Sequence, residues 1–180
     1  RIRIKLCRWK LPVLAGTLAR RSIRVLEQAF DLVPCRVALV LFRTWLNGWC
    51  TARRFQQSGS SCLFDCCMAH SDLREDSIEH YAMCSVVRKV GRCFVGLQDS
   101  HYSTWLCNFV ALGLNQGKVD EKTLTLRASL VYAVFRTTNA LRHNPTTSRE
   151  VAHDMLVQFA KEAVRGHSKA TAYLQGVSST

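Results

Sequence analysis

The sequence predicts a mainly α-helical domain with a small cysteine-rich insert and little or no sheet. Over most of its 180 residues, apolar side chains recur three or four positions apart, the spacing of one face of a helix. Helix-ending residues such as Pro34, Gly48 and Gly166 separate these segments. A group of cysteines with one histidine occupies residues 62–84. Together, these observations favour helices packed on helices around one local insert.

The bulk composition fits a folded chain in a reducing compartment. Of all residues, 48% are hydrophobic and 21% are charged, values that are typical of globular proteins. The nine cysteines are an odd number, and several lie inside apolar helical patterns, which argues against a disulfide framework. The chain begins with Arg1 rather than Met, so we expect a fragment or a processed product.

The net charge of +12 is concentrated at the N-terminal end. Residues 1–60 hold twelve Lys or Arg against two acids, residues 61–100 four against six, and residues 101–180 nine against five. A basic segment of this kind favours a polyanionic partner, most simply nucleic acid. The alternative is a solvated basic surface that binds nothing.

Two helices are expected in the N-terminal third. Residues 1–12 alternate basic and apolar residues, which suits a short strand or an arm that becomes ordered on RNA or DNA. A helix is predicted over 17–31, and a second over 35–46, where Pro34 suits the first helical position. The second is apolar nearly all round and is our candidate for the central core helix. It is too short to span a membrane, and no membrane partner is expected.

The C-terminal half predicts longer helices. A helix that begins near Asp76 is expected to run to Val90, and a buried helix is expected over 101–112. A long helix follows from Asp120 or Lys122 to Leu141, where His143-Asn-Pro145 ends it.

A final helix is predicted to open on a capping box formed by Thr147 and Glu150. Its apolar stripe would be Val151, Met155, Phe159 and Ala163, with Gly166 as the C′ residue.

These elements divide the chain into five regions. They are a basic N-terminal segment (1–15), a helical region with a basic loop (16–60), a metal-binding module (61–92), a C-terminal helical region (93–175) and a loose tail (176–180).

Residues 62–84 contain the sequence form of a four-ligand zinc site. A close pair of thiols, Cys62 with Cys66 or Cys67, is followed by His80 and Cys84 at i and i+4. Zn²⁺ prefers a tetrahedron of thiolate and imidazole ligands, and Cys₃His is one of its structural sets. The spacing leaves open which of the two adjacent cysteines binds, and His70 is a competing ligand. The alternative is a set of ordinary buried thiols.

A basic and aromatic stretch leads into this site. Arg53 and Arg54 lie between Trp49 and Phe55, the combination that a phosphate-binding and base-stacking surface needs. The alternative is that the aromatic residues pack under the zinc site and the arginines are merely solvated. Further on, Arg88, Lys89 and Arg92 are predicted to be exposed on the next helix.

No catalytic constellation is evident in the sequence, and whether the chain belongs to an enzyme stays open. It lacks an Asp-Asp doublet of the polymerase type, a Gly-rich phosphate loop, a Gly-x-Ser-x-Gly elbow and a His-Glu-x-x-His helix. Its densest acidic group, Asp72, Glu75, Asp76 and Glu79, is interpreted as helix caps and solvent-facing residues.

Four features follow one another between residues 33 and 90. They are a helix that begins with Pro and contains a Trp, a basic loop, a Cys pair, and a final Glu-His…Cys. The matching stretches are Val33-Pro34, Arg43-Thr-Trp-Leu-Asn-Gly-Trp-Cys-Thr-Ala-Arg-Arg-Phe55, Cys62-Leu-Phe-Asp-Cys66 and Asp76-Ser-Ile-Glu-His80-Tyr-Ala-Met-Cys84. This order resembles the zinc-binding segment that follows the reverse transcriptase domain of non-LTR retrotransposons, especially retroelement-derived open reading frames of protists.

The resemblance implies Cys62, Cys66, His80 and Cys84 as zinc ligands. It also implies RNA or DNA binding through Arg53, Arg54, Arg88 and Lys89, beside a polymerase domain upstream in the same polyprotein that would carry any RNA-directed DNA polymerase activity. Two departures from the family pattern concern the second ligand. Asp65 stands where the family often has Gly, and Cys67 is a rival donor.

Two other functions remain as alternatives. One is a structural RNA-binding protein of a ribonucleoprotein, for example an organellar ribosome. The other is a helical protein-interaction module in which zinc only holds helices together. The resemblance to a retrotransposon reverse transcriptase implies an intracellular, nuclear location. The ribonucleoprotein alternative implies a location in an organelle.

Overall fold

The computed structural model describes residues 9, 15–57, 61–66, 75–93, 95, 97, 109–110, 120–144 and 148–175. Within these ranges the chain is mainly helical, and its one isolated β-bridge, between Ser61 and Glu75, is antiparallel. The predicted mainly α class is therefore confirmed. Most of the predicted N-terminal segment and of the helix expected over 101–112, and all of the C-terminal tail, lie outside the described residues.

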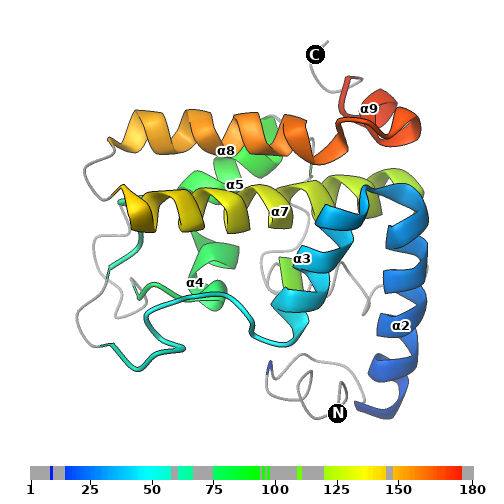
Figure 1. The fold of residues 1–180 in the computed structure, drawn as a ribbon, viewed down its shortest axis with the longest axis horizontal. Helices are drawn as coiled ribbons and strands as arrows, with labels where there is room; N and C mark the ends of the chain where they lie inside the picture. Colours follow the sequence, from blue (N-terminus) through cyan, green and yellow to red (C-terminus); the bar gives the residue numbers. More distant parts are fainter. Residues whose placement is uncertain are drawn as a thin grey trace.

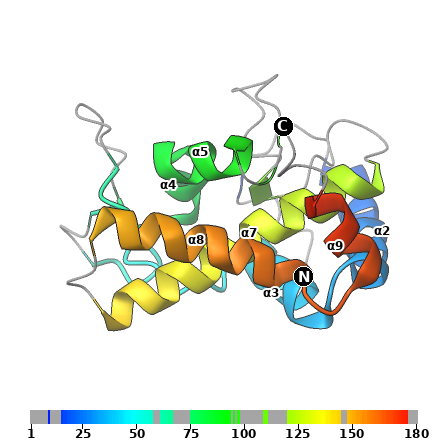
Figure 2. The ribbon, with the colours of Figure 1, turned by 90° about the horizontal axis from the view of Figure 1, so that it is seen from above.

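Seven helices are bounded in the described ranges. They are α2 (Ala15–Leu32), α3 (Cys35–Trp45), α4 (Ile78–Met83), α5 (Ser85–Cys93), α7 (Glu121–His143), α8 (Arg149–Val164) and α9 (Ser168–Gln175). Helices α7 and α8 lie side by side and antiparallel, with α3 and α2 against α7 and with α5 against α8 (Figures 1 and 2). No helix among the described residues is long and apolar enough to cross a membrane.

Helix α7 is the central helix of the core, and the prediction that gave this place to α3 is wrong. Buried residues occur on all sides of α7, whereas α3 leaves Leu39 49% exposed. Three of the four buried Ser and Thr hydroxyls on α7 donate to backbone carbonyls of their own helix, and only Thr125 Oγ1 has no hydrogen-bond partner among the described residues. Ser129 donates to the Thr125 carbonyl at 2.8 Å. Thr137 and Thr138 do the same toward Ala133 and Phe135. Hydroxyls satisfied within the helix can be buried at little cost, so residues that look polar in the sequence line the core.

The end of α3 and the turn after it contribute two buried tryptophans to the core. Trp45 donates its indole N–H to the carbonyl of Val110 at 2.7 Å, and Trp49 donates to Thr44 Oγ1 at 2.9 Å. Both rings are only 1% exposed. Because buried indole N–H groups need acceptors, these bonds fix where the chain leaves α3 and enters the loop that precedes the metal-binding segment.

The start of α8 differs from the prediction. The N-cap is Ser148, whose hydroxyl accepts from the Val151 amide at 3.4 Å, whereas the prediction placed the cap at Thr147, which lies outside the described residues. At the other end, Gly166 follows the C-cap with φ +85°, as expected of a C′ glycine.

The first three positions of the apolar stripe expected on α8 are displaced by one residue, whereas Ala163 is buried as predicted. Val151 is 49% exposed, and the buried residues of this helix are Ala152, Leu156, Ala160, Ala163 and Val164. Three of these five are alanines, whose small side chains let neighbouring helices approach closely.

Candidate metal centre

Two short segments supply the candidate ligands. Ser61 pairs with Glu75 in the isolated β-bridge, which brings the turn that holds Cys62 and Cys66 next to the start of α4. His80 lies on α4, and Cys84 follows its last residue. Cys84 has φ −58° and ψ 129°, which are not helical values, so α4 and α5 are separate helices. The prediction of one continuous helix from Asp76 to Val90 is wrong because the backbone breaks at this cysteine.

The four side chains form one compact, buried cluster. All four ligand atoms lie within 4.8 Å of one another. The Sγ atoms of Cys62 and Cys84 are 3.9 Å apart, and Cys66 Sγ is 3.3 Å from His80 Nε2. In a zinc tetrahedron with Zn–S bonds near 2.3 Å, neighbouring sulfurs are about 3.8 Å apart. The donor set and its spacing therefore suit a tetrahedral metal ion. Cys66 is the second cysteine of this cluster, whereas Cys67 and His70 lie outside the described residues.

The electrostatics of the cluster favour a cation. Hydrogen bonding to Cys84 is the main cause that lowers the pKa of Cys62 to about 4. Burial by itself lowers the pKa of His80, but the hydrogen bond and the charge of Cys62, together with Cys66, outweigh it and raise the pKa to about 9. The hydrogen bond to Cys62 raises the pKa of Cys84. A buried group that already stabilises a thiolate in this way suits a metal ion, which binds thiolates and displaces their protons.

The turn between the two cysteines contains a left-handed residue. Asp65 has φ +45°, and its amide donates to the Cys62 carbonyl at 3.1 Å. Only glycine adopts this backbone conformation without steric cost, although Asp tolerates it better than most residues. The turn itself therefore favours glycine at position 65.

Asp65→Gly should therefore leave the metal-loaded protein equally stable or stabilise it by up to about 1 kcal/mol, because relief of strain outweighs added chain entropy. Asp65→Val should destabilise it by about 1–2 kcal/mol, since a β-branched residue resists positive φ. Thermal melting measures both changes. Ser61 is the control position, because it is exposed and has a negative φ. At this position the Val variant should be more stable than the Gly variant. If the Gly variant is the more stable one at both positions, the explanation by backbone strain is contradicted.

Ser77, and not Asp76, caps α4. The Ser77 hydroxyl accepts from the amide of His80 at 3.1 Å, which anchors the first turn at the ligand residue. Asp76 is instead the centre of a buried polar network. Its two carboxylate oxygens accept from Arg142 Nη2 at 2.6 and 2.8 Å, and Oδ2 also accepts from the Ala52 amide at 2.9 Å. The Tyr81 hydroxyl donates to Oδ1.

This network corrects the interpretation of Asp76 as a cap or a solvent-facing acid. The carboxylate side chain is 5% exposed, so it is paired away from water. Burial and the neighbouring Asp76 raise the pKa of Tyr81, which keeps its hydroxyl a donor. Arg142 lies at the C-terminal end of α7, 66 positions along the chain, so no local pattern indicates this partner.

A cluster of aromatic rings packs against Tyr81, the neighbour of His80 on α4. Phe64 meets Tyr81 edge to face at 5.5 Å between ring centroids, and Trp49 stacks on Tyr81 at 6.4 Å. Trp49 also meets Phe135 of α7 at 5.4 Å. The alternative interpretation of Trp49, that it packs beneath the metal site, is therefore confirmed for that residue, and it is not an exposed stacking surface.

The four predicted nucleic-acid-binding residues lie in different surroundings. Arg53 forms exposed ion pairs with Glu75 and Glu79 at 3.6 and 3.4 Å. Arg54 is exposed and has no carboxylate partner among the described residues. On α5, Arg88 is half-buried and Lys89 is exposed.

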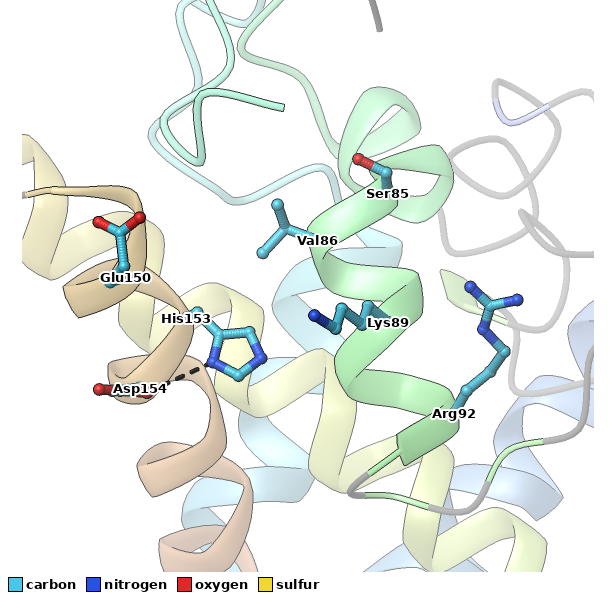
Figure 3. A pocket seen from close by; sticks show the side chains of 7 residues that line it. All are labelled: Ser85, Val86, Lys89, Arg92, Glu150, His153 and Asp154. Atoms are coloured by element: carbon cyan, nitrogen blue, oxygen red, sulfur yellow. Dashed lines mark hydrogen bonds and ion pairs between the residues drawn. The ribbon is translucent and has the colours of Figure 1, made fainter. Parts of the chain in front are cut away.

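Lys89 lines a groove of about 580 Å³ between α5 and α8 (Figure 3). Its side chain points toward α8, where His153 lies 3.4 Å from Asp154 and where Glu150 and Asp154 also line the groove. Lys89 therefore shares its groove with acidic side chains, whereas Arg53 is paired with them directly. Arg54 is the predicted cation with the least compensation nearby.

No family model, curated protein or solved structure matches this chain. The site is therefore defined by its own residues: a buried Cys₃His cluster that could hold a metal ion, joined through Asp76 to the end of α7.

Proposed function

We propose that this chain is a zinc-stabilised nucleic-acid-binding module. One observation carries the proposal: the loop with Arg53 and Arg54 is hydrogen-bonded directly to Asp76, which precedes the N-cap of the helix that holds His80. Ala52 donates to the Asp76 carboxylate at 2.9 Å, and the Arg53 amide donates to the Asp76 carbonyl at 3.2 Å. A metal that orders Cys62, Cys66, His80 and Cys84 would thereby also hold this basic loop in place.

The charge of the chain supports a polyanion as the partner. The net charge of +12 attracts phosphate over a long range, and exposed Arg54 can donate to it at close range. Zinc has a structural role in this proposal. Three thiolates and one imidazole complete its tetrahedron, so no position is left for a reacting ligand.

Binding to a labelled nucleic acid should weaken steeply as salt rises. With three phosphate contacts, the affinity should fall about 15- to 45-fold between 50 and 200 mM salt. An Arg53→Ala/Arg54→Ala double variant should bind more weakly and with a smaller salt slope. Lys169→Ala on α9, an equally exposed cation away from the loop, is the charge control and should change little.

Weak binding that is indifferent to salt would rule out the proposal, as would unchanged binding by the double variant. Either result would favour a helical protein-interaction module, in which the metal only holds the helices together.

The resemblance of residues 33–90 to retrotransposon reverse transcriptases supports a narrower proposal. In it, this module grips template RNA or target DNA beside a polymerase domain encoded upstream. A polymerase Asp-Asp motif in the preceding reading frame would support that origin. A short free-standing gene with a targeting peptide would favour the structural protein of a ribonucleoprotein instead.

A further inference from the structure

Phe55 is exposed although the aromatic rings around the metal centre are buried. Its exposed fraction is 55%, against 1% for Trp49 and 0% for both Phe64 and Tyr81. The loop therefore presents to solvent a ring of the kind on which a nucleic-acid base can stack.

The loop presents this ring on an ordered backbone. The amide of Phe55 donates to the Thr51 carbonyl at 3.3 Å, and the amide of Gln57 donates to the Ala52 carbonyl at 3.0 Å. Ala52 is in turn bonded to the buried Asp76 carboxylate. A ring held in this way loses little conformational freedom when it binds a partner.

A cation accompanies the ring. The Arg54 guanidinium lies over Phe55 with its central carbon 5.5 Å from the ring centroid, and it donates to the Trp49 carbonyl at 3.2 Å. A planar cation over one face of a half-exposed aromatic ring offers groups that match the two parts of a nucleotide, the phosphate and the base. Arg53, the preceding residue, is instead paired with Glu75 and Glu79, whose carboxylates repel phosphate.

We propose that the Arg54–Phe55 pair binds an unpaired nucleotide of a single-stranded nucleic acid, with the base stacked on Phe55 and its phosphate on Arg54. This inference rests on the proposed nucleic-acid binding and specifies its substrate. Bases within a duplex already stack on their neighbours, so their faces are not available to a side chain. A single strand can turn a base outward at little cost.

The test compares two labelled probes, an oligouridine strand of about 12 nucleotides and a duplex of about 12 base pairs, by fluorescence anisotropy. Phe55→Leu should weaken binding of the strand about 5- to 100-fold, the range expected for one lost base–aromatic stack. Binding of the duplex should change less than about twofold, and the salt slope for the strand should stay the same because no charge is removed. Phe55→Trp should restore the affinity for the strand.

Leu39→Ala on α3, which removes an equally exposed apolar side chain, is the control and should affect neither probe. Equal loss with both probes, or a reduced salt slope, would overturn the stacking role, because the ring would then act by positioning Arg54. Unchanged binding by Phe55→Leu would overturn it while leaving the proposed function intact. A wild-type chain that binds neither probe would overturn the proposed function as well.

Discussion

Cys84→Ser should release the metal and unfold the segment that holds it. Cys84 is fully buried, and its sulfur lies 3.9 Å from that of Cys62, so serine would put a poor zinc ligand at the centre of the cluster. The purified wild type should contain about one zinc per chain, and the variant none. The free energy of unfolding should fall by at least about 3 kcal/mol, because in small metal sites the binding free energy is folding free energy.

Cys50→Ser is the matched control, since it removes one thiol from an exposed position outside the cluster. It should keep the metal and the stability of the wild type. His80→Ala should reproduce the loss seen with Cys84→Ser, and a chelator should lower the melting temperature of the wild type toward that of the two ligand variants. Elemental analysis and thermal melting measure these effects. If the wild type contains no metal and its melting temperature does not change with the chelator, the four residues are ordinary core side chains and not metal ligands.

The sequence was sufficient to predict the features that depend on neighbouring residues. The mainly α class followed from apolar spacing, and the end of α8 followed from Gly166, whose φ of +85° matches its expected place. The candidate ligands also came from a local pattern, which left Cys66 and Cys67 as alternatives for the second ligand. The structure brings Cys62, Cys66, His80 and Cys84 within 4.8 Å of one another. The sequence did not predict the break in the helix at Cys84. Two ligands at positions i and i+4 can both lie on one helix, or the second can directly follow the helix that holds the first, as Cys84 does.

Features that depend on tertiary contacts could not be predicted from the sequence. Trp49 and Phe55 belong to the same basic and aromatic run, yet one is buried against Tyr81 and Phe135 and the other is open to solvent. The central place of α7 was not evident because the helix buries threonines and serines, and most of their hydroxyls bond within the helix. Burial is decided by what packs against a residue, and composition alone does not contain that information.

Asp76→Ala should destabilise the fold about as much as the loss of a core side chain. Its carboxylate accepts from Arg142, the Ala52 amide and the Tyr81 hydroxyl, so alanine leaves a partly buried cation and two donors without their acceptor. Removing one partner of such a pair costs about 3–5 kcal/mol. For a chain of this size, that should lower the melting temperature by roughly 10 °C.

The effect should extend to the metal, because the bond from Tyr81 to Asp76 helps to fix the helix that carries His80. Zinc affinity should fall about 10- to 100-fold, as for other residues that orient ligands without binding the ion. Glu75→Ala is the matched control: it removes a carboxylate one position away that pairs with Arg53 at the surface, where such pairs contribute about 0–1 kcal/mol.

Arg142→Ala alone should also destabilise the protein, but the Asp76→Ala/Arg142→Ala double variant should be more stable than the sum of the two single changes predicts. That non-additivity isolates the energy of the pair from the loss of each side chain. Because the pair joins the metal-binding segment to the end of α7, a positive coupling would mean that metal loading and packing of the central helix stabilise each other. Additive effects, or an Asp76→Ala variant that melts like Glu75→Ala, would mean that the two parts fold independently.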